Sequence, residues 1–223
     1  DGVEYIEPVY VIKSTDADAV YVPDNVIYTP SVAVTRTEMP FNDPMLSQQW
    51  HYNNEGSIRR AVEGADIDLF EAWKTTAGDP AVIVAIMDGG VQWDHPDLAA
   101  NMWTNTAELN GSEGRDDDSN GYADDIHGFN FVDNTTLTIS TKGDAPDHGT
   151  HVAGTVAAVN NNGTGVAGIA GGSGKNDGVK IMSCEILGKS ESGSSGAGLA
   201  GQIRAIKYAA DNGAVICQNS WGY

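Results

Sequence analysis

The chain has 223 residues, which is enough for one sizeable domain or for a domain with a peripheral arm. Its 12 basic residues against 31 acidic ones give a formal net charge of -19. Such a charge repels nucleic-acid backbones and anionic lipid surfaces but attracts divalent cations. The sequence contains no apolar run long enough to cross a membrane and no signal-peptide pattern at its first residues. We therefore expect neither a nucleic-acid partner nor insertion into a membrane.

Residues 1–40 differ in pattern from the rest of the chain. Short stretches of alternating apolar and polar residues are broken there by prolines, which is typical of edge strands or of an extended arm. The pattern changes at Phe41. We therefore expect an arm over residues 1–40 and one domain over residues 41–223.

A first helix is expected early in this domain. Residues 65–78 carry Ile67, Phe70 and Trp73 at helical spacing and end at a glycine. This pattern predicts one helix with an apolar face.

Three continuous apolar runs predict strands of a parallel sheet that are buried on both faces. The runs are residues 81–87, 179–187 and 214–220. A helix is predicted between the last two, because four apolar residues form one helical stripe before a glycine. The stripe consists of Leu199, Ile203, Ile206 and Ala210. This order predicts an α/β fold, a parallel β-sheet flanked by helices. Cys184 and Cys217 lie within these runs, and we expect both thiols to be packed in the core.

Two polar residues are expected to meet at one edge of this sheet. Asp88 is the first polar residue after the first apolar run, and two glycines follow it. Residues 147–158 carry an apolar stripe that predicts a helix beginning near His148. Ligands collect beyond the carboxyl ends of parallel strands, where Asp88 lies. An aspartate there could orient the imidazole and leave its second nitrogen free as a general base, as in a Ser-His-Asp triad. The alternatives are a turn aspartate and a histidine with a purely structural place.

A zinc site is a rival interpretation of the same residues. His148 and His151 lie three residues apart on the predicted helix, and Asp88 or His95 could complete the ligand set. The glycine-rich surroundings and the lack of an H-E-x-x-H pattern weigh against zinc.

An acidic loop lies at residues 113–125. Oxygen-bearing side chains alternate in its centre and precede Gly121, as in the first half of an EF-hand loop. No glutamate stands at the twelfth position, and Asp124 or Asp125 could close the shell instead. The loop is therefore predicted to bind Ca²⁺, with a solvated acidic turn as the alternative. The predicted ligands are Asp116, Asp118, Asn120, the carbonyl of Tyr122, and Asp125.

Three segments, "IMDGGVQWDHPDL", "DHGTHVAGTVAA" and "NSWG", together resemble the subtilisin-like serine protease family. The similarity runs from about Asn42 to the last residue. It implies that Asp88 and His148 are the catalytic aspartate and histidine and that His151 is a structural residue of the helix. Gly89 stands where the family usually has Ser or Thr, so a hydroxyl that supports the aspartate is absent. The substrate-binding residues that the resemblance implies are Ser192, Gly193, Ser194, Ser220, Trp221 and Gly222.

The family's nucleophilic serine and oxyanion asparagine lie downstream of "NSWG", and no "GTS" motif occurs in this sequence. Loss of such a serine lowers turnover about a millionfold. The resemblance therefore implies the amino-terminal half of a secreted or cell-surface endopeptidase, inactive alone. Its partners would be polypeptide substrates and the missing C-terminal half of the domain. The alternative is a non-catalytic pseudoprotease or a calcium-stabilised binding domain.

The resemblance implies two further features. A second Ca²⁺ site would involve Asp97, Gln48 or Gln49, and the loop over residues 159–166 with Asn161, although this loop is one residue longer than the commonest form. The stretch "GVEYIEP" resembles the end of the family's inhibitory propeptide. The arm would then be a propeptide remnant and linker, and the chain's own propeptide would be a partner.

Overall fold

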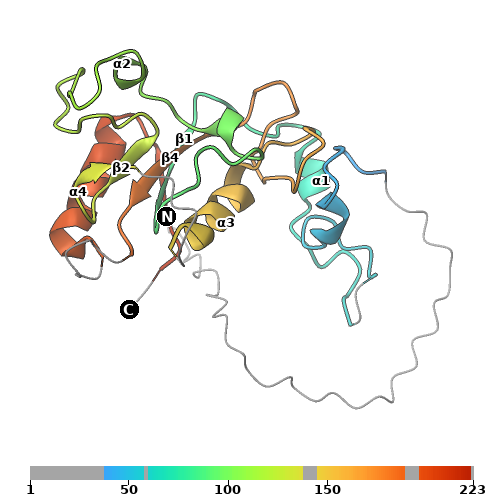
Figure 1. Ribbon diagram of the computed structural model, residues 1–223. Coiled ribbons are helices and arrows are strands. Elements are labelled where there is room, and N and C mark those ends of the chain that lie inside the picture. The colour runs from blue at the N-terminus through green and yellow to red at the C-terminus, as the bar shows by residue number, and fades with distance from the viewer. Residues whose placement is uncertain (1–37, 58–59, 138–144, 189–195, 222–223) are drawn as a thin grey trace, which may run out of the picture.

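The computed structural model describes residues 38–57, 60–137, 145–188 and 196–221 (Figure 1). Nearly all of the predicted arm, and the predicted substrate-binding residues Ser192, Gly193, Ser194 and Gly222, lie outside these ranges. The longer elements are two helices and three strands. They are β1 (Ile83–Asp88), α3 (Ala145–Ala157), β4 (Lys180–Glu185), α4 (Gly198–Asp211) and β5 (Ile216–Asn219). The shorter ones are η1 (Leu46–Gln48), α1 (Leu69–Ala72), η2 (Ala99–Asn101), α2 (Thr106–Leu109), β2 (Gly128–Asn130) and β3 (Thr135–Thr136).

The strands form one five-stranded sheet in the order β3-β2-β4-β1-β5. All neighbouring pairs are parallel except β2 with β3. β1 pairs with β4 over its whole length, from Ile83 opposite Lys180 to Asp88 opposite Glu185. The predicted α/β fold is therefore confirmed. β1 lies between β4 and β5, so the two strands that α4 connects are not neighbours.

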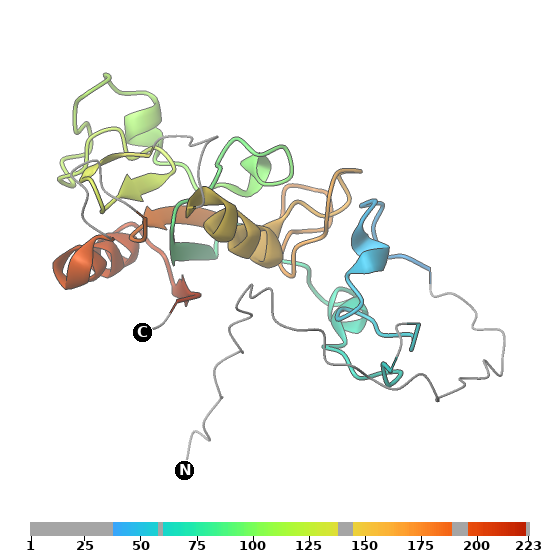
Figure 2. The ribbon, with the colours of Figure 1, turned by 60° about the horizontal axis from the view of Figure 1, so that its bottom comes forward.

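Helices cover both faces of the sheet, with α3 on one face and α4 on the other (Figure 2). Successive strand residues point to opposite faces, and each face of β1 and β4 contacts its own helix. This confirms the prediction that these two strands are buried on both sides. The α3 side includes Val84, Ile86, Ile181, Ala153 and Ala157. The α4 side includes Ala85, Met87, Met182, Cys184, Ala205 and Tyr208.

β5 departs from the sequence-based expectation of burial, and the apolar stripe of α4 is exposed. Ile216 in β5 is 49% exposed and Cys217 is exposed, so this strand and this thiol are not buried. β5 has β1 on one side only and forms an edge of the described sheet. In α4, Leu199 is 70% exposed and Ile203 is 58% exposed. The helix instead buries a face with small residues, which allows it to lie close to the sheet. The small residues are Gly201, Ala205 and Ala209, and Tyr208 is buried beside them.

The prediction was therefore wrong for the burial of β5 and of Cys217, whereas the buried Cys184 confirms it. Burial raises the pKa of the Cys184 thiol.

The helix predicted over residues 65–78 has only four residues, Leu69–Ala72. Asp68 before it has a left-handed backbone, with φ +52°, which breaks the helical path on that side. Ile67 is consequently 53% exposed. Trp73 still packs on Phe70 at 5.6 Å between ring centroids, so the two later apolar positions lie together as expected.

Candidate functional site

Asp88 and His148 meet at the carboxyl end of β1. The imidazole Nδ1 lies 2.8 Å from Asp88 Oδ1 and 3.0 Å from Oδ2. A carboxylate can only accept a hydrogen bond, so Nδ1 carries the proton that it donates to Asp88. The other ring nitrogen, Nε2, is then left without a proton and can act as a base.

The local backbone explains this approach. Gly90 has φ +97°, which turns the chain immediately after Asp88. Gly149, next to His148 in α3, packs directly on that turn, since a Cβ at Gly149 would lie 2.1 Å from the carbonyl oxygen of Gly90. The helix can come this close only because no side chain stands between the two backbones.

The two partners differ in exposure. The Asp88 side chain is 2% exposed, whereas that of His148 is 56% exposed. The backbone N–H of Gly89 also donates to Asp88 Oδ1 at 2.7 Å, so the buried carboxylate has a second donor. A buried, hydrogen-bonded carboxylate thus holds an imidazole whose far side faces solvent. This geometry suits proton transfer to and from a bound molecule.

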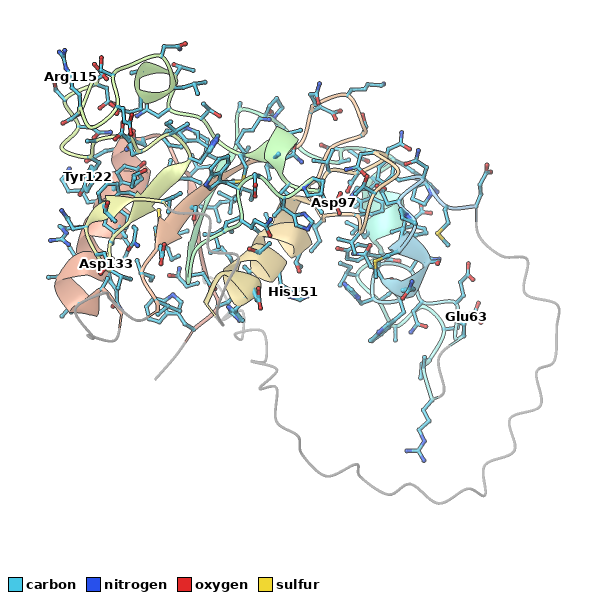
Figure 3. All side chains as sticks on the ribbon, viewed as in Figure 1. Glu63, Asp97, Arg115, Tyr122, Asp133 and His151 are labelled. Atoms are coloured by element: carbon cyan, nitrogen blue, oxygen red, sulfur yellow. The ribbon has the colours of Figure 1, made fainter. Side chains whose placement is uncertain are left out.

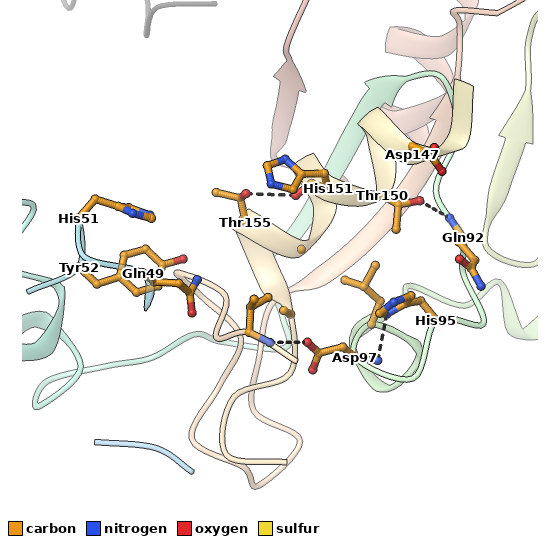
Figure 4. A pocket seen from close by; sticks show the side chains of 14 residues that line it. Gln49, His51, Tyr52, Gln92, His95, Asp97, Asp147, Thr150, His151 and Thr155 are labelled. Atoms are coloured by element: carbon orange, nitrogen blue, oxygen red, sulfur yellow. Dashed lines mark hydrogen bonds between the residues drawn. The ribbon is translucent and has the colours of Figure 1, made fainter. Parts of the chain in front are cut away.

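A cavity of about 590 Å³ lies on another side of α3, between that helix, the loop after β1 and residues near Tyr52 (Figure 4). His51, His95 and His151 line it from three separate elements. His95 Nδ1 accepts a hydrogen bond from the backbone N–H of Asp97 at 3.2 Å. The expected structural residue His151 is exposed here and does not accompany His148.

The geometry gives the zinc interpretation no support. His148 is directed to Asp88, and the described residues contain a single group of three metal-binding side chains, which is acidic and excludes both histidines.

That acidic group lies in the loop predicted to bind a cation. Oxygen atoms of Glu108, Asp118 and Asp125 all lie within 4.8 Å of one another. Asp125 is completely buried, while Asp118 is exposed. Figure 3 shows this loop, marked by Arg115 and Tyr122, far from Asp97 at the other predicted cation region.

Neutral donors surround the carboxylate of Asp125. The Tyr208 hydroxyl of α4 donates to Oδ2 at 2.7 Å, and amide groups of Asn105 and Asn120 donate at 2.8 Å and 2.9 Å. Burial is the main cause that raises the pKa of Asp125 to about 6, and the charge of Asp118 adds to it. Burial thus disfavours the ionised form of Asp125, while the three donors stabilise it and offset part of that cost.

The other predicted ligands have different roles in the structure. The Asp116 carboxylate accepts backbone N–H groups from Asn120 at 3.0 Å and Gly121 at 2.8 Å, which shapes the turn. Asn120 Oδ1 accepts the N–H of Tyr122 at 2.8 Å. The Tyr122 ring packs on Phe129 and Tyr208, with centroids 4.9 Å away in each case.

Sequence reasoning missed Glu108. Its carboxylate accepts the N–H groups of Asp117 and Asp124, at 2.7 Å and 2.8 Å, and so holds the loop closed. Glu108 lies in α2, outside the alternating pattern, and is only 4% exposed. The one available signal was an acid on a short polar helix directly before a loop of acids.

The comparison with known proteins shows the family of the chain. The sequence model of the Subtilase family matches residues 79–223. The chain belongs to the subtilase family.

Relatives of this subtilase chain include proteases of Plasmodium and of Natrialba. "Subtilisin-like protease 1" of Plasmodium vivax is 36% identical over 82% of this chain and 25% of its own length. The "Halolysin-like extracellular serine protease Nep" of Natrialba magadii is 32% identical over 89% of this chain and 29% of its own length. The chain thus spans about a quarter of the length of these relatives.

A solved structure of the serine protease of Aeromonas sobria, in complex with a chaperone, has a similar fold. The TM-score is 0.59 and the identity 26%, over 85% of this chain and 27% of that one. The fold and the protease family of the subtilase chain are therefore established. In the part of the chain that the structure describes, no helix is both long and apolar enough to cross a membrane.

The predicted substrate-binding residues of the subtilase chain are described only at Ser220 and Trp221. They follow β5, whose last paired residue, Asn219, lies opposite Met87 of β1. Ser220 Oγ accepts a hydrogen bond from Gln218 Nε2 at 2.9 Å. Trp221 is half-buried and packs on the core of the α4 side.

The second predicted cation region brings Asp97 and Asn161 into one neighbourhood. Asp97 accepts from Asn162 Nδ2 at 2.8 Å and from the N–H of Val166 at 2.9 Å. Gln49, by contrast, exchanges two hydrogen bonds with the backbone of Ala167.

Sequence reasoning missed Asp43, which is 5% exposed and accepts the N–H of Asn161 at 2.8 Å. Burial raises the pKa of Asp43, and the nearby charge of Asp97 raises it further. The available signal was the aspartate in the stretch "NDP", residues 42–44, near the start of the predicted domain.

Proposed function

We propose that this chain supplies the general base and its orienting carboxylate to a subtilisin-like serine endopeptidase. The observation that carries the proposal is the contact of His148 Nδ1 with Asp88 Oδ1 at 2.8 Å, beneath a ring that is 56% exposed. Asp88 selects the tautomer with the proton on Nδ1 and stabilises the imidazolium that forms during reaction.

Peptide hydrolysis would then run through an acyl-enzyme. His148 Nε2 takes the proton of a serine hydroxyl as that oxygen attacks the peptide carbonyl, and then returns it to the leaving amine. Water repeats the sequence and releases the acid. The 223 residues contain no G-T-S motif, so we expect no turnover of peptide substrates by these residues alone.

Exposed apolar residues on one side of the chain support the view that further polypeptide completes the site. Leu199, Ile203 and Ile206 in α4 are at least half exposed, and β5 is an edge strand of the sheet that the described residues form. An apolar face and a free strand edge of this kind are suited to further polypeptide that packs on them. The relatives of the chain are about four times longer, which fits the same view.

A labelling experiment with a fluorophosphonate tests the function. The probe reacts with an activated serine, so we expect labelling of the protein extended along its own reading frame and none of the 223-residue chain. Asp88→Asn should lower the labelling rate and kcat/KM of the extended protein about 10⁴-fold, since the amide favours the wrong tautomer. Asp94→Asn, at an exposed position, is the control. A folded extended protein that resists the probe would favour a binding domain without catalysis.

We also propose that the acidic loop holds Ca²⁺ through Glu108, Asp118 and Asp125. Hard oxygen donors are the ligands this ion prefers, and the group offers three carboxylates at short mutual distance. The raised pKa of Asp125, about 6, supports a site that needs a positive charge. When bound, the ion would neutralise the repulsion among these acids. Asp116, Asn120 and the Tyr122 carbonyl stay as candidates for its remaining ligands.

We propose a second Ca²⁺ site around Asp97 and Asn161, in which Asp43 would supply a second carboxylate. Its support is the buried pair of Asp43 and Asp97, whose mutual repulsion a cation would relieve. Gln49 is left out of this proposal, because both of its amide atoms already bind the backbone of Ala167.

The wider setting follows from the relatives. We propose polypeptide substrates and a location outside the cell or on its surface, as for the relative named an extracellular serine protease. The arm over residues 1–40 is proposed as a propeptide remnant and linker, on the basis of its resemblance to a propeptide end. Amino-terminal sequencing of the mature protein tests this, and a mature start before Val20 would contradict it.

A further inference from the structure

A second acidic side chain stands beside Asp88. Glu185 ends β4, and its Cα pairs with that of Asp88 in the parallel register. Paired residues of neighbouring strands point to the same face, so both carboxyl groups lie on the α3 side. Ser183, two residues earlier, confirms this face, since its Oγ accepts the N–H of Val91 at 3.2 Å.

The Glu185 side chain lies under the turn that supports the Asp88–His148 pair. A Cβ built on Gly90 would meet Glu185 Oε2 at 3.4 Å and Cδ at 3.5 Å. On its other side the Gly90 carbonyl packs against Gly149 of α3, beside His148. Gly90 is thus held between the Glu185 carboxyl and the helix that carries the imidazole.

We propose that Glu185 is a positioning residue that sets the charge around the Asp88–His148 pair according to whether its carboxyl group holds a proton. The inference rests on the proposed roles of Asp88 and His148. Glu185 itself contacts neither substrate nor the ring, and acts through the Gly90 turn and through its charge.

The surroundings of Glu185 explain why it would change charge near neutral pH. Burial is the main cause that raises the pKa of Glu185 to about 7, and the charge of Asp133 adds to it. The ionisable groups nearest to it in the elements described are Asp88, opposite it in the register of β1, and Asp133 after β2, which Figure 3 labels, while His148 on α3 lies beyond Asp88. Burial and the charge of Asp133 thus disfavour a negative Glu185.

The expected consequence has a definite sign. Below pH 7 the neutral Glu185 leaves Asp88 as the carboxylate that faces the imidazole. Above pH 7 a second negative charge lies next to Asp88 and stabilises the protonated ring. The imidazole then keeps its proton to a higher pH than Asp88 alone would allow, and the onset of base catalysis moves upward with it.

Nuclear magnetic resonance on the 223-residue chain tests this without a serine. The chain carries ¹³C-labelled histidine and glutamate and is titrated from pH 5 to 9, with His148→Ala to assign the ring. We expect the His148 ring to report two transitions, one sharing the midpoint of the Glu185 carboxyl carbon. Glu185→Gln should abolish that transition and move the other to lower pH by about half a unit or more. The exposed Glu63→Gln should change neither.

Each result decides the inference. If the ring of the wild-type chain does not respond at the Glu185 midpoint, the coupling is overturned, even if Glu185→Gln fails to fold. Identical curves for a folded Glu185→Gln overturn it as well. These outcomes leave the proposed peptidase untouched, whereas a failed fluorophosphonate reaction would leave the measured coupling of the two groups in place.

Discussion

Asp88 and His148 illustrate how burial divides labour between two residues. Asp88 is enclosed at the end of a buried strand and accepts from the imidazole and from the N–H of Gly89. His148 lies at the first turn of α3, and its side chain is more than half exposed. A fixed acceptor beneath a reachable base is the arrangement that proton transfer requires. Asp125 differs in that its partner Tyr208 is buried as well, so that neither group faces solvent.

Asp125 should make the metal-free chain lose stability as the pH rises. Its pKa is raised from 3.8 to about 6 in the folded state, so the folded chain binds this proton more tightly than the unfolded chain does. That stabilisation is complete below pH 4 and is lost as the pH rises to 6, about 3 kcal/mol in all.

Urea unfolding between pH 4 and 7 with a chelator measures this effect. The unfolding free energy of the wild-type chain should fall across that window relative to that of Asp125→Asn, whose amide does not titrate. A difference that stays constant with pH would show that Asp125 keeps an ordinary pKa in the folded chain.

At the scale of single elements, α3 depends on glycine at one position and not at another. A Cβ at Gly149 would lie 2.1 Å from the Gly90 carbonyl oxygen, whereas a Cβ at Gly154 would meet nothing within 4 Å. The two glycines share one helix, so they form a matched pair.

Gly149→Ala should therefore destabilise the chain by about 3 kcal/mol, because the helix must move away from the turn after β1. Gly154→Ala should stabilise it by up to about 1 kcal/mol through helix propensity. Equilibrium unfolding in urea measures both. Equal effects of the two substitutions would contradict the close contact of α3 with Gly90.

The acidic loop connects α2 with α4, since Asp125 accepts a hydrogen bond from the Tyr208 hydroxyl of α4. Calcium at about 100 times its Kd should add about 2.7 kcal/mol to the unfolding free energy. For a domain of this size that raises Tm by about 5 to 10 °C. Glu108→Gln and Asp118→Asn should remove most of the increase, while Asp94→Asn should keep it.

Thermal unfolding with a chelator, with Ca²⁺ and with Mg²⁺ makes the measurement. If Glu108→Gln responds to Ca²⁺ as the wild-type chain does, the ion binds elsewhere.

At the scale of the whole molecule, the described helices cover the sheet and its apolar residues unevenly, which favours association. The α3 side and the inner face of α4 bury a continuous core, but Leu199, Ile203 and β5 face outward. Apolar area and an open strand edge on one side favour association.

We expect the chain by itself to associate as its concentration rises. Replacing Leu199 and Ile203 together by Gln should shift the population toward the monomer, because the apolar stripe is then interrupted. Lys207→Arg, which keeps an exposed charge on the same helix, should have no effect. Sedimentation velocity at several concentrations gives the populations. A wild-type chain that remains monomeric throughout would contradict this expectation.

Local sequence determined the strands β1 and β4, the helix α3 and the place of Asp88, because a buried strand and a helical stripe are visible as patterns along the chain. It also indicated the acidic loop. Only the tertiary structure decided which face of α4 is buried, since the small residues that allow close packing outweigh the larger apolar ones. Glu108, Asp43 and Glu185 are likewise defined by neighbours distant in sequence. Burial and charge at those residues depend on what the fold brings beside them, and no pattern along one segment contains that information.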